Sequence, residues 1–123
     1  MMPMTAMELV QAARQSIEEI EPALAHSLLD TMPVLDVREP AEFAAGCLPG
    51  SINLPRGMLE FKIGAMSYCK PDAPLLVYCQ SGGRSALAVE TLRKMGYTRA
   101  VSLAGGYKLW QESGLPVVHP SSA

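Results

Sequence analysis

The stretch CQSGGRS, residues 79–85, combines residue types that suit nucleophilic chemistry. A cysteine reacts as its thiolate, and Arg84 places a fixed cation close to Cys79 in the sequence. A helix that we expect to begin at Arg84 would direct its N-terminal amide groups back at this loop. Gly82 and Gly83 let the backbone curl so that several N–H groups converge on one point. The stretch therefore predicts a cradle for a sulfur anion or a bound oxyanion.

A lone cysteine that closes a buried strand is more often a small apolar packing residue. Here strand, cysteine, small polar loop, arginine and helix occur together, and this combination favours a functional role. We assign catalysis to Cys79 and Arg84. The residues assigned to substrate binding in the active-site loop are Gln80, Ser81, Gly82, Gly83 and Ser85.

The other cysteines and the histidines do not form a metal-binding pattern. Cys47 and Cys69 stand far apart, the chain has no C-x-x-C motif, and His26 and His119 are its two histidines. This spacing does not match a zinc site, and we predict neither a metal nor a cofactor. We expect both histidines at the surface or on a helix face, and the sequence does not indicate a partner for either.

Strand and helix patterns alternate along the chain and predict an α/β fold with a mostly parallel sheet covered on both faces. The expected strands are 17–20, 33–37, 51–55, 75–79 and 100–106. The expected helices are 5–15, 22–30, 40–46, 56–66, 84–95 and 107–114, and 115–118 closes the domain. Ligands of such sheets bind outside the carboxyl ends of the strands, which is where Cys79 would lie.

Length and composition fit one ordinary globular domain. The chain has 123 residues, of which 49% are hydrophobic and 18% charged. The net charge of −2 argues against nucleic acid as a partner, and no apolar run approaches the ~20 residues of a membrane span. The N-terminus does not have the features of a signal peptide, so we expect a cytoplasmic protein with reduced cysteines.

Three ordered blocks of this sequence resemble the rhodanese family of sulfurtransferases. The loop CQSGGRS is similar to the family's active-site loop, and LDVREPAEFAAGCLPGSINLP, residues 35–55, to two further segments. LAGGYKLWQESGLPV, residues 103–117, is similar to its closing segment, and RGMLEFKI to single-domain bacterial members. The resemblance spans 17–118, so we expect a rhodanese-like domain over 17–123 and an N-terminal helical extension over 1–16.

The resemblance implies a single domain with a five-stranded parallel sheet flanked by helices on both faces. It implies that the thiolate of Cys79 takes sulfane sulfur from thiosulfate or a persulfide donor, and passes it to a thiol or cyanide. A protein could supply or receive the persulfide. Arg84 would orient the anionic donor, and Asp36 and Arg38 would brace the loop; Trp110 is expected in the core.

Other functions remain open at this point. The domain could be a non-catalytic persulfide carrier or a protein-docking module. It could be a cysteine phosphatase or arsenate reductase, but related enzymes of that kind have five residues between cysteine and arginine, and four separate Cys79 from Arg84. Cys47 replaces a histidine that is usual in the family. We expect it to pack beneath the loop; resolving a persulfide is the alternative.

Overall fold

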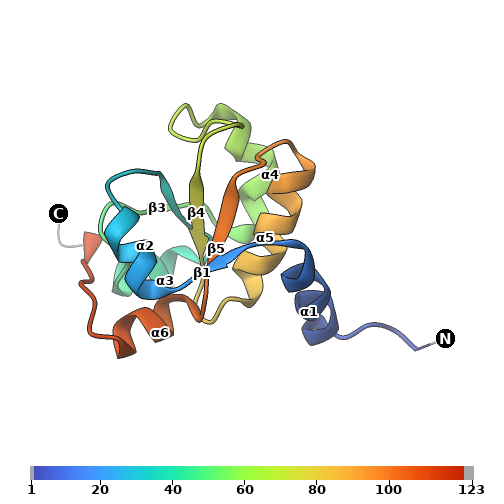
Figure 1. Cartoon of the computed structure of the whole chain (residues 1–123), viewed down its shortest axis with the longest axis horizontal. Helices are drawn as coiled ribbons and strands as arrows, with labels where there is room; N and C mark the ends of the chain where they lie inside the picture. Colours follow the sequence, from blue (N-terminus) through green and yellow to red (C-terminus); the bar gives the residue numbers. More distant parts are fainter. Residues whose placement is uncertain (1, 121–123) are drawn as a thin grey trace.

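Five strands form one parallel sheet in the computed structural model, which describes residues 2–120 (Figure 1). They are β1 (Glu19–Ile20), β2 (Val34–Asp36), β3 (Ile52–Asn53), β4 (Leu75–Tyr78) and β5 (Ala100–Leu103). Their order across the sheet is β1-β5-β4-β2-β3, and every pairing is parallel. The predicted five-stranded α/β fold is confirmed.

The central strand β4 is buried on both faces, which explains its uninterrupted apolar sequence. Leu75 and Val77 point into one core cluster, whereas Leu76 and Tyr78 point into the cluster on the opposite face. All four residues are at most 1% exposed. The strand therefore ends immediately before Cys79, with its neighbours β2 and β5 paired to it on either side.

Within residues 2–120, six α-helices and two 3₁₀ turns surround the sheet. The α-helices are α1 (Ala6–Ser16), α2 (Pro22–Leu28), α3 (Pro40–Ala45), α4 (Leu59–Lys62), α5 (Gly83–Lys94) and α6 (Gly106–Glu112). The 3₁₀ turns are η1 (Arg56–Met58) and η2 (Ile63–Ala65). Apolar residues of α4 and α5 share one core cluster, and those of α2 and α6 share the cluster on the other face.

Helix α1 begins at a capping box and packs against α5. The side chain of Thr5 accepts a hydrogen bond from the backbone N–H of Glu8, whose carboxylate accepts one from the N–H of Thr5. Val10 and Ala13 are buried against Ala86 of α5. Figure 1 shows α1 beside the beginning of α5, close to the end of the sheet where β4 stops.

Several predicted elements are shorter or packed differently. The strand expected over 17–20 is reduced to Glu19–Ile20, and the helix expected over 56–66 is broken into η1, α4 and η2. His26 is exposed on α2, as expected, and its ring lies edge-on to the buried ring of Trp110 with 5.8 Å between centroids. Within residues 2–120, no helix has the length and apolar character needed to cross a bilayer.

Candidate active site

The sulfur of Cys79 lies at the carboxyl end of β4, inside the curled loop 79–85, which we call the sulfur ring. The residue is 1% exposed, and its Sγ accepts hydrogen bonds from the backbone N–H of Gly82 at 3.1 Å and of Ser85 at 3.3 Å. The Ser85 hydroxyl is 3.5 Å from the same sulfur. Converging amides of this kind stabilise negative charge on the atom that they surround.

The loop can close so tightly because of Gly82, which has φ of +105°. Side chains rarely adopt this conformation, and glycine does so without penalty. The first turn of α5 follows at once, so the amide of Ser85 points at the sulfur rather than into the helix. The sequence thus places two glycines where the backbone must turn from strand to helix around one atom.

A serine pair fixes the far side of the ring. The hydroxyl of Ser85 lies 2.8 Å from the hydroxyl of Ser102 and donates to the carbonyl of Gly82 at 3.3 Å. Both serines are fully buried. Sequence reasoning did not identify Ser102, although a polar residue inside the apolar strand AVSL was a usable signal.

The first turn of α6 holds the loop by two backbone hydrogen bonds. The backbone N–H of Tyr107 donates to the carbonyl of Cys79 at 2.8 Å, and that of Lys108 donates to the carbonyl of Gln80 at 3.0 Å. Gly106 makes this approach possible, because a Cβ there would lie 2.6 Å from the carbonyl oxygen of Cys79. With their carbonyls bound on this side, the loop residues can present their N–H groups to the sulfur.

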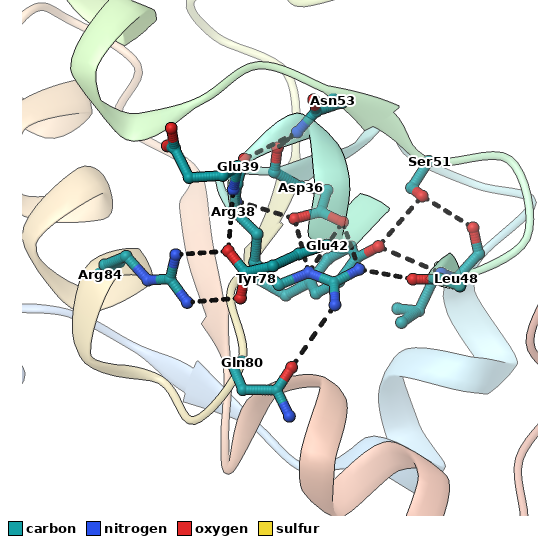
Figure 2. Close-up of polar contacts among 11 residues, drawn as sticks. Asp36, Arg38, Glu39, Glu42, Leu48, Ser51, Asn53, Tyr78, Gln80 and Arg84 are labelled. Carbon is teal, nitrogen blue, oxygen red and sulfur yellow. Dashed lines mark hydrogen bonds and ion pairs between the residues drawn. The ribbon is translucent and has the colours of Figure 1, made fainter. Parts of the chain in front are cut away.

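Asp36 and Arg38 form a buried ion pair beside the loop (Figure 2). Their side chains are 0% and 2% exposed, and Nη2 of Arg38 lies 2.7 Å from Oδ2 of Asp36. Arg38 also donates to the carbonyl of Gly46 at 2.7 Å and to Oε1 of Gln80 at 3.4 Å, and its guanidinium lies 4.3 Å from the ring centroid of Tyr107. Arg38 thus connects β2 to the loop and to α6.

The pKa of Arg38 reflects this environment. Burial acts to lower the pKa, but hydrogen bonds and the negative charge of Asp36 outweigh it and raise the pKa above its ordinary value. Arg38 therefore stays charged, and the two oxygens of Asp36 hold the guanidinium plane in place.

Arg84 points toward α3, where the carboxylate of Glu42 binds it (Figure 2). Nη1 lies 2.8 Å from Oε1 of Glu42, and Nη2 lies 3.0 Å from Oε2. The hydrogen bond from Arg84 lowers the pKa of Glu42 to about 2, against a smaller opposing effect of burial. Glu42 is the third residue of α3 after its N-cap Glu39, and sequence reasoning gave it no role.

The structure thus brings most of the predicted loop residues together, with differences among them. Gly82 and Ser85 are buried and contact the sulfur, Gln80 meets Arg38, and the side chain of Ser81 is exposed. Arg84 is in the same loop, but its guanidinium is engaged by a carboxylate. Its predicted role toward the donor remains a prediction.

The other two cysteines, Cys47 and Cys69, are buried like Cys79. All three are unpaired and buried, and the backbone of Cys47 bridges to Val118 near the chain's end. Burial raises the pKa of the Cys47 thiol and raises that of Cys69 to about 11. Such thiols remain protonated at neutral pH, unlike the reactive thiolate that a nucleophile requires.

A separate groove of about 450 Å³ lies at the amino ends of the strands, between α2 and the end of α5. Glu18, Leu28 and Arg93 are among the residues that line it. None of the loop residues 79–85 contributes to it. The loop around Cys79 therefore lies at the opposite end of the sheet from this groove.

The sequence of this chain is similar to those of known rhodanese-like domains and sulfurtransferases. The family model of the rhodanese-like domain matches residues 21–113. The chain is 39% identical over 100 residues to a sulfurtransferase of Allochromatium vinosum, covering 80% of this chain and 91% of that protein. It is 37% identical over 90 residues to human thiosulfate:glutathione sulfurtransferase, covering 64% of this chain and 78% of that protein.

A solved structure from Rhodopseudomonas palustris has the same fold, with a TM-score of 0.81 and 34% sequence identity. The match covers 96% of this chain and 100% of that chain. That protein is described as of unknown function and a possible tyrosine phosphatase.

Proposed function

This chain belongs to the family of rhodanese-like domains, and from this premise we propose that it transfers sulfane sulfur through a persulfide on Cys79. The observation that carries the proposal is the pair of hydrogen bonds that Sγ accepts from the backbone N–H groups of Gly82 and Ser85. These donors are fixed by the fold before any donor molecule arrives, so they require no reorganisation when charge develops on sulfur.

In the first half-reaction the thiolate of Cys79 attacks the outer sulfur of thiosulfate. A new S–S bond forms to Sγ, the S–S bond of thiosulfate breaks, and sulfite leaves with the electron pair. The product is a Cys79 persulfide that carries one negative charge on its terminal sulfur. Names of relatives, thiosulfate sulfurtransferase and thiosulfate:glutathione sulfurtransferase, support thiosulfate as the donor class.

In the second half-reaction a nucleophile attacks the terminal sulfur of the persulfide. A thiolate acceptor becomes a persulfide, cyanide becomes thiocyanate, and the Cys79 thiolate leaves with the bonding electron pair. The amides of Gly82 and Ser85 stabilise that thiolate as it leaves, just as they stabilise it before attack. Such a two-step covalent mechanism produces ping-pong kinetics.

The proposal is tested by the intact mass of the protein after incubation with thiosulfate. We expect a gain of one sulfur atom that disappears on addition of cyanide. Cys79→Ser removes the nucleophile and should abolish the gain, whereas Cys69→Ser, which alters a buried core thiol, should keep it. A folded wild-type protein that gains no mass would contradict sulfur transfer through Cys79.

Turnover separates an enzyme from a persulfide carrier. We expect continuous thiocyanate production from thiosulfate and cyanide, with parallel lines in double-reciprocal plots. A stable Cys79 persulfide that turns over only with a second protein would identify a carrier instead. If neither sulfur gain nor turnover occurs, hydrolysis of an aryl phosphate by the wild type but not by Cys79→Ser would identify a phosphatase.

A further inference from the structure

Helix α1 lies outside the family match, yet it contacts the loop that holds the sulfur. The match begins at residue 21, whereas α1 covers Ala6–Ser16. Cγ2 of Val10 lies 3.6 Å from the point that a Cβ on Gly83 would occupy. Gly83 begins α5, the helix whose first turn supplies the Ser85 amide to the sulfur. The extension therefore packs on the sulfur ring from its outer side.

Arg14 is the charged residue of this contact. Its Nη2 lies 3.0 Å from the point that a Cβ on Gly82 would occupy, so the guanidinium covers the outer side of that residue. Gly82 is also the residue whose N–H donates to the sulfur at 3.1 Å. One residue thus has the sulfur on its inner side and a cation on its outer side.

The guanidinium of Arg14 is bound less closely by carboxylates than those of Arg38 and Arg84. Its Nε lies 3.5 Å from Oε2 of Glu19, and this buried Nε has no hydrogen-bond partner within residues 2–120. By contrast, Arg84 is bound by both oxygens of Glu42, and Arg38 by both oxygens of Asp36. The Nη2 end of Arg14 is directed at the loop.

We propose that Arg14 is a positioning residue that stabilises the sulfur anion of Cys79 through the loop at Gly82. It limits movement of the Gly82 backbone, which keeps that N–H aimed at Sγ, and it adds positive charge on the outer side of the ring. The same field favours the thiolate before attack and the persulfide afterwards. This inference rests on the proposed role of Cys79 as the nucleophile.

Charged groups from several elements surround the sulfur ring, and the arginines among them differ in how closely a carboxylate pairs with them. They are Arg14 of α1, Glu19 of β1, Asp36 of β2, Arg38 beyond it, Glu42 of α3, Arg84 of α5 and, with an exposed side chain, Lys108 of α6. Arg38 and Arg84 have close carboxylate partners at 2.7 and 2.8 Å. Arg14 has a longer contact with its carboxylate partner, 3.5 Å to Glu19, so its charge is compensated less closely.

The test measures the rate at which iodoacetamide alkylates Cys79 as a function of pH, which requires no sulfur donor. In Arg14→Gln we expect a rate about threefold to tenfold lower at neutral pH, and a pH midpoint displaced upward. Arg14→Lys, which keeps the charge, should recover part of the rate. Arg93→Gln is the matched control, since Arg93 is exposed in the last turn of α5, and its profile should equal that of wild type.

Glu19→Gln distinguishes the proposed role of Arg14 from a purely structural one, because the two roles predict opposite changes in the alkylation rate of Cys79. Removing this carboxylate leaves Arg14 without its counter-charge, so the alkylation midpoint should move downward and the rate at neutral pH should rise. The double variant Arg14→Gln with Glu19→Gln should lose this gain. The melting temperature of each variant is measured as well. We expect the ranking of the variants by alkylation rate not to follow their melting temperatures.

Three results would overturn the proposal: a profile of Arg14→Gln equal to wild type, equal losses in Arg14→Gln and Arg14→Lys that follow a lower melting temperature, or no change in Glu19→Gln. The readout also separates this inference from the proposed function. If alkylation depends on Arg14 but thiosulfate adds no sulfur, the effect of Arg14 on Cys79 stands and sulfur transfer fails.

Discussion

Both oxygens of the Glu42 carboxylate bind the guanidinium of Arg84, at 2.8 and 3.0 Å, across the space between α3 and α5. The two side chains are 33% and 39% exposed, so the pair lies at the protein surface beside the sulfur ring. An anionic donor that uses Arg84 must therefore compete with Glu42 for the same N–H groups. If Arg84 binds the donor as we predict, Glu42 competes with the donor for this guanidinium.

Glu42→Gln should strengthen the use of thiosulfate. The neutral amide holds Arg84 less tightly, and the freed guanidinium can pair with the dianionic donor. We expect KM for thiosulfate to fall about threefold while kcat with cyanide changes little, the pattern of added ground-state binding. Steady-state thiocyanate formation at varied thiosulfate measures both constants.

Glu60→Gln is the matched control for this substitution. Glu60 of α4 pairs with Arg56 of η1 at 2.9 Å, outside the loop. Its substitution by Gln removes the same charge from the protein. Its KM should equal that of wild type. A higher KM in Glu42→Gln would mean instead that the carboxylate is needed to hold Arg84 in a productive position.

The same carboxylate predicts a pH dependence of stability. The hydrogen bond from Arg84 lowers the pKa of Glu42 from an ordinary 4.5 to about 2 in the folded protein. A depressed folded pKa means that Glu42 stabilises the fold above the ordinary value, and that this contribution is lost as the pH falls toward 2. Because both groups are partly exposed, solvent screening limits it to about 1 kcal/mol or less.

Urea unfolding of wild type and Glu42→Gln tests this dependence. Wild type should be the more stable of the two at about pH 6, and the difference in free energy of unfolding should shrink at about pH 3. Salt at ~1 M should shrink it as well, because it screens a partly exposed pair. A difference that stays constant over both pH values and both salt concentrations would show that charge is not its source.

The strand, loop and helix around Cys79 could be predicted from the sequence because their signals are local. The apolar run of β4, the glycines of the loop and the apolar spacing of α5 all lie within residues 75–95. The edge strands were harder. Strands β1 and β3 have two residues each and pair with one neighbour, so they lack a long pattern to recognise.

Contacts between distant segments could not be predicted in the same way. Glu42 and Arg84 are 42 positions apart, and Ser85 and Ser102 are 17 apart. Which residues meet across such separations depends on how the sheet orders its strands, and no spacing in the sequence encodes that order. The contact of Arg14 with the loop depends in addition on how α1 packs against α5.

Asp36→Asn should destabilise the protein strongly. The substitution leaves Arg38 charged at a site where its side chain is 2% exposed and its partner is lost. Removing one member of a buried pair costs about 3–5 kcal/mol, because the remaining charge is neither hydrated nor compensated. The free energy of unfolding from urea titration measures this loss.

The partly exposed ion pair of Arg56 and Glu60 is the control for the buried pair of Asp36 and Arg38. Glu60→Gln removes a carboxylate whose side chain is 40% exposed, so its effect should be at most about 1 kcal/mol. Equal effects of Asp36→Asn and Glu60→Gln would mean that water or a rearranged neighbour satisfies Arg38. That result would contradict its role as a fixed brace between β2 and the loop.

Gly106→Ala should disrupt the sulfur ring itself. The new Cβ would lie 2.6 Å from the carbonyl oxygen of Cys79 and 2.7 Å from the carbonyl of Gln80, so the loop backbone must move. Gly106 also has φ of +63°, a conformation that costs a side chain about 1–2 kcal/mol. Gly114→Ala isolates that second cost, because its φ is +74° and nothing lies within 4 Å of its added Cβ.

We therefore expect Gly114→Ala to lose about 1–2 kcal/mol of stability and to keep its kcat, since the ring is untouched. Gly106→Ala should lose more, and its folded fraction should form the Cys79 persulfide at least about tenfold more slowly, because the Gly82 and Ser85 amides no longer converge on Sγ. Urea unfolding and the initial rate of mass gain, normalised to folded protein, measure the two effects. Equal behaviour of the two variants would show that the α6 turn does not position the loop.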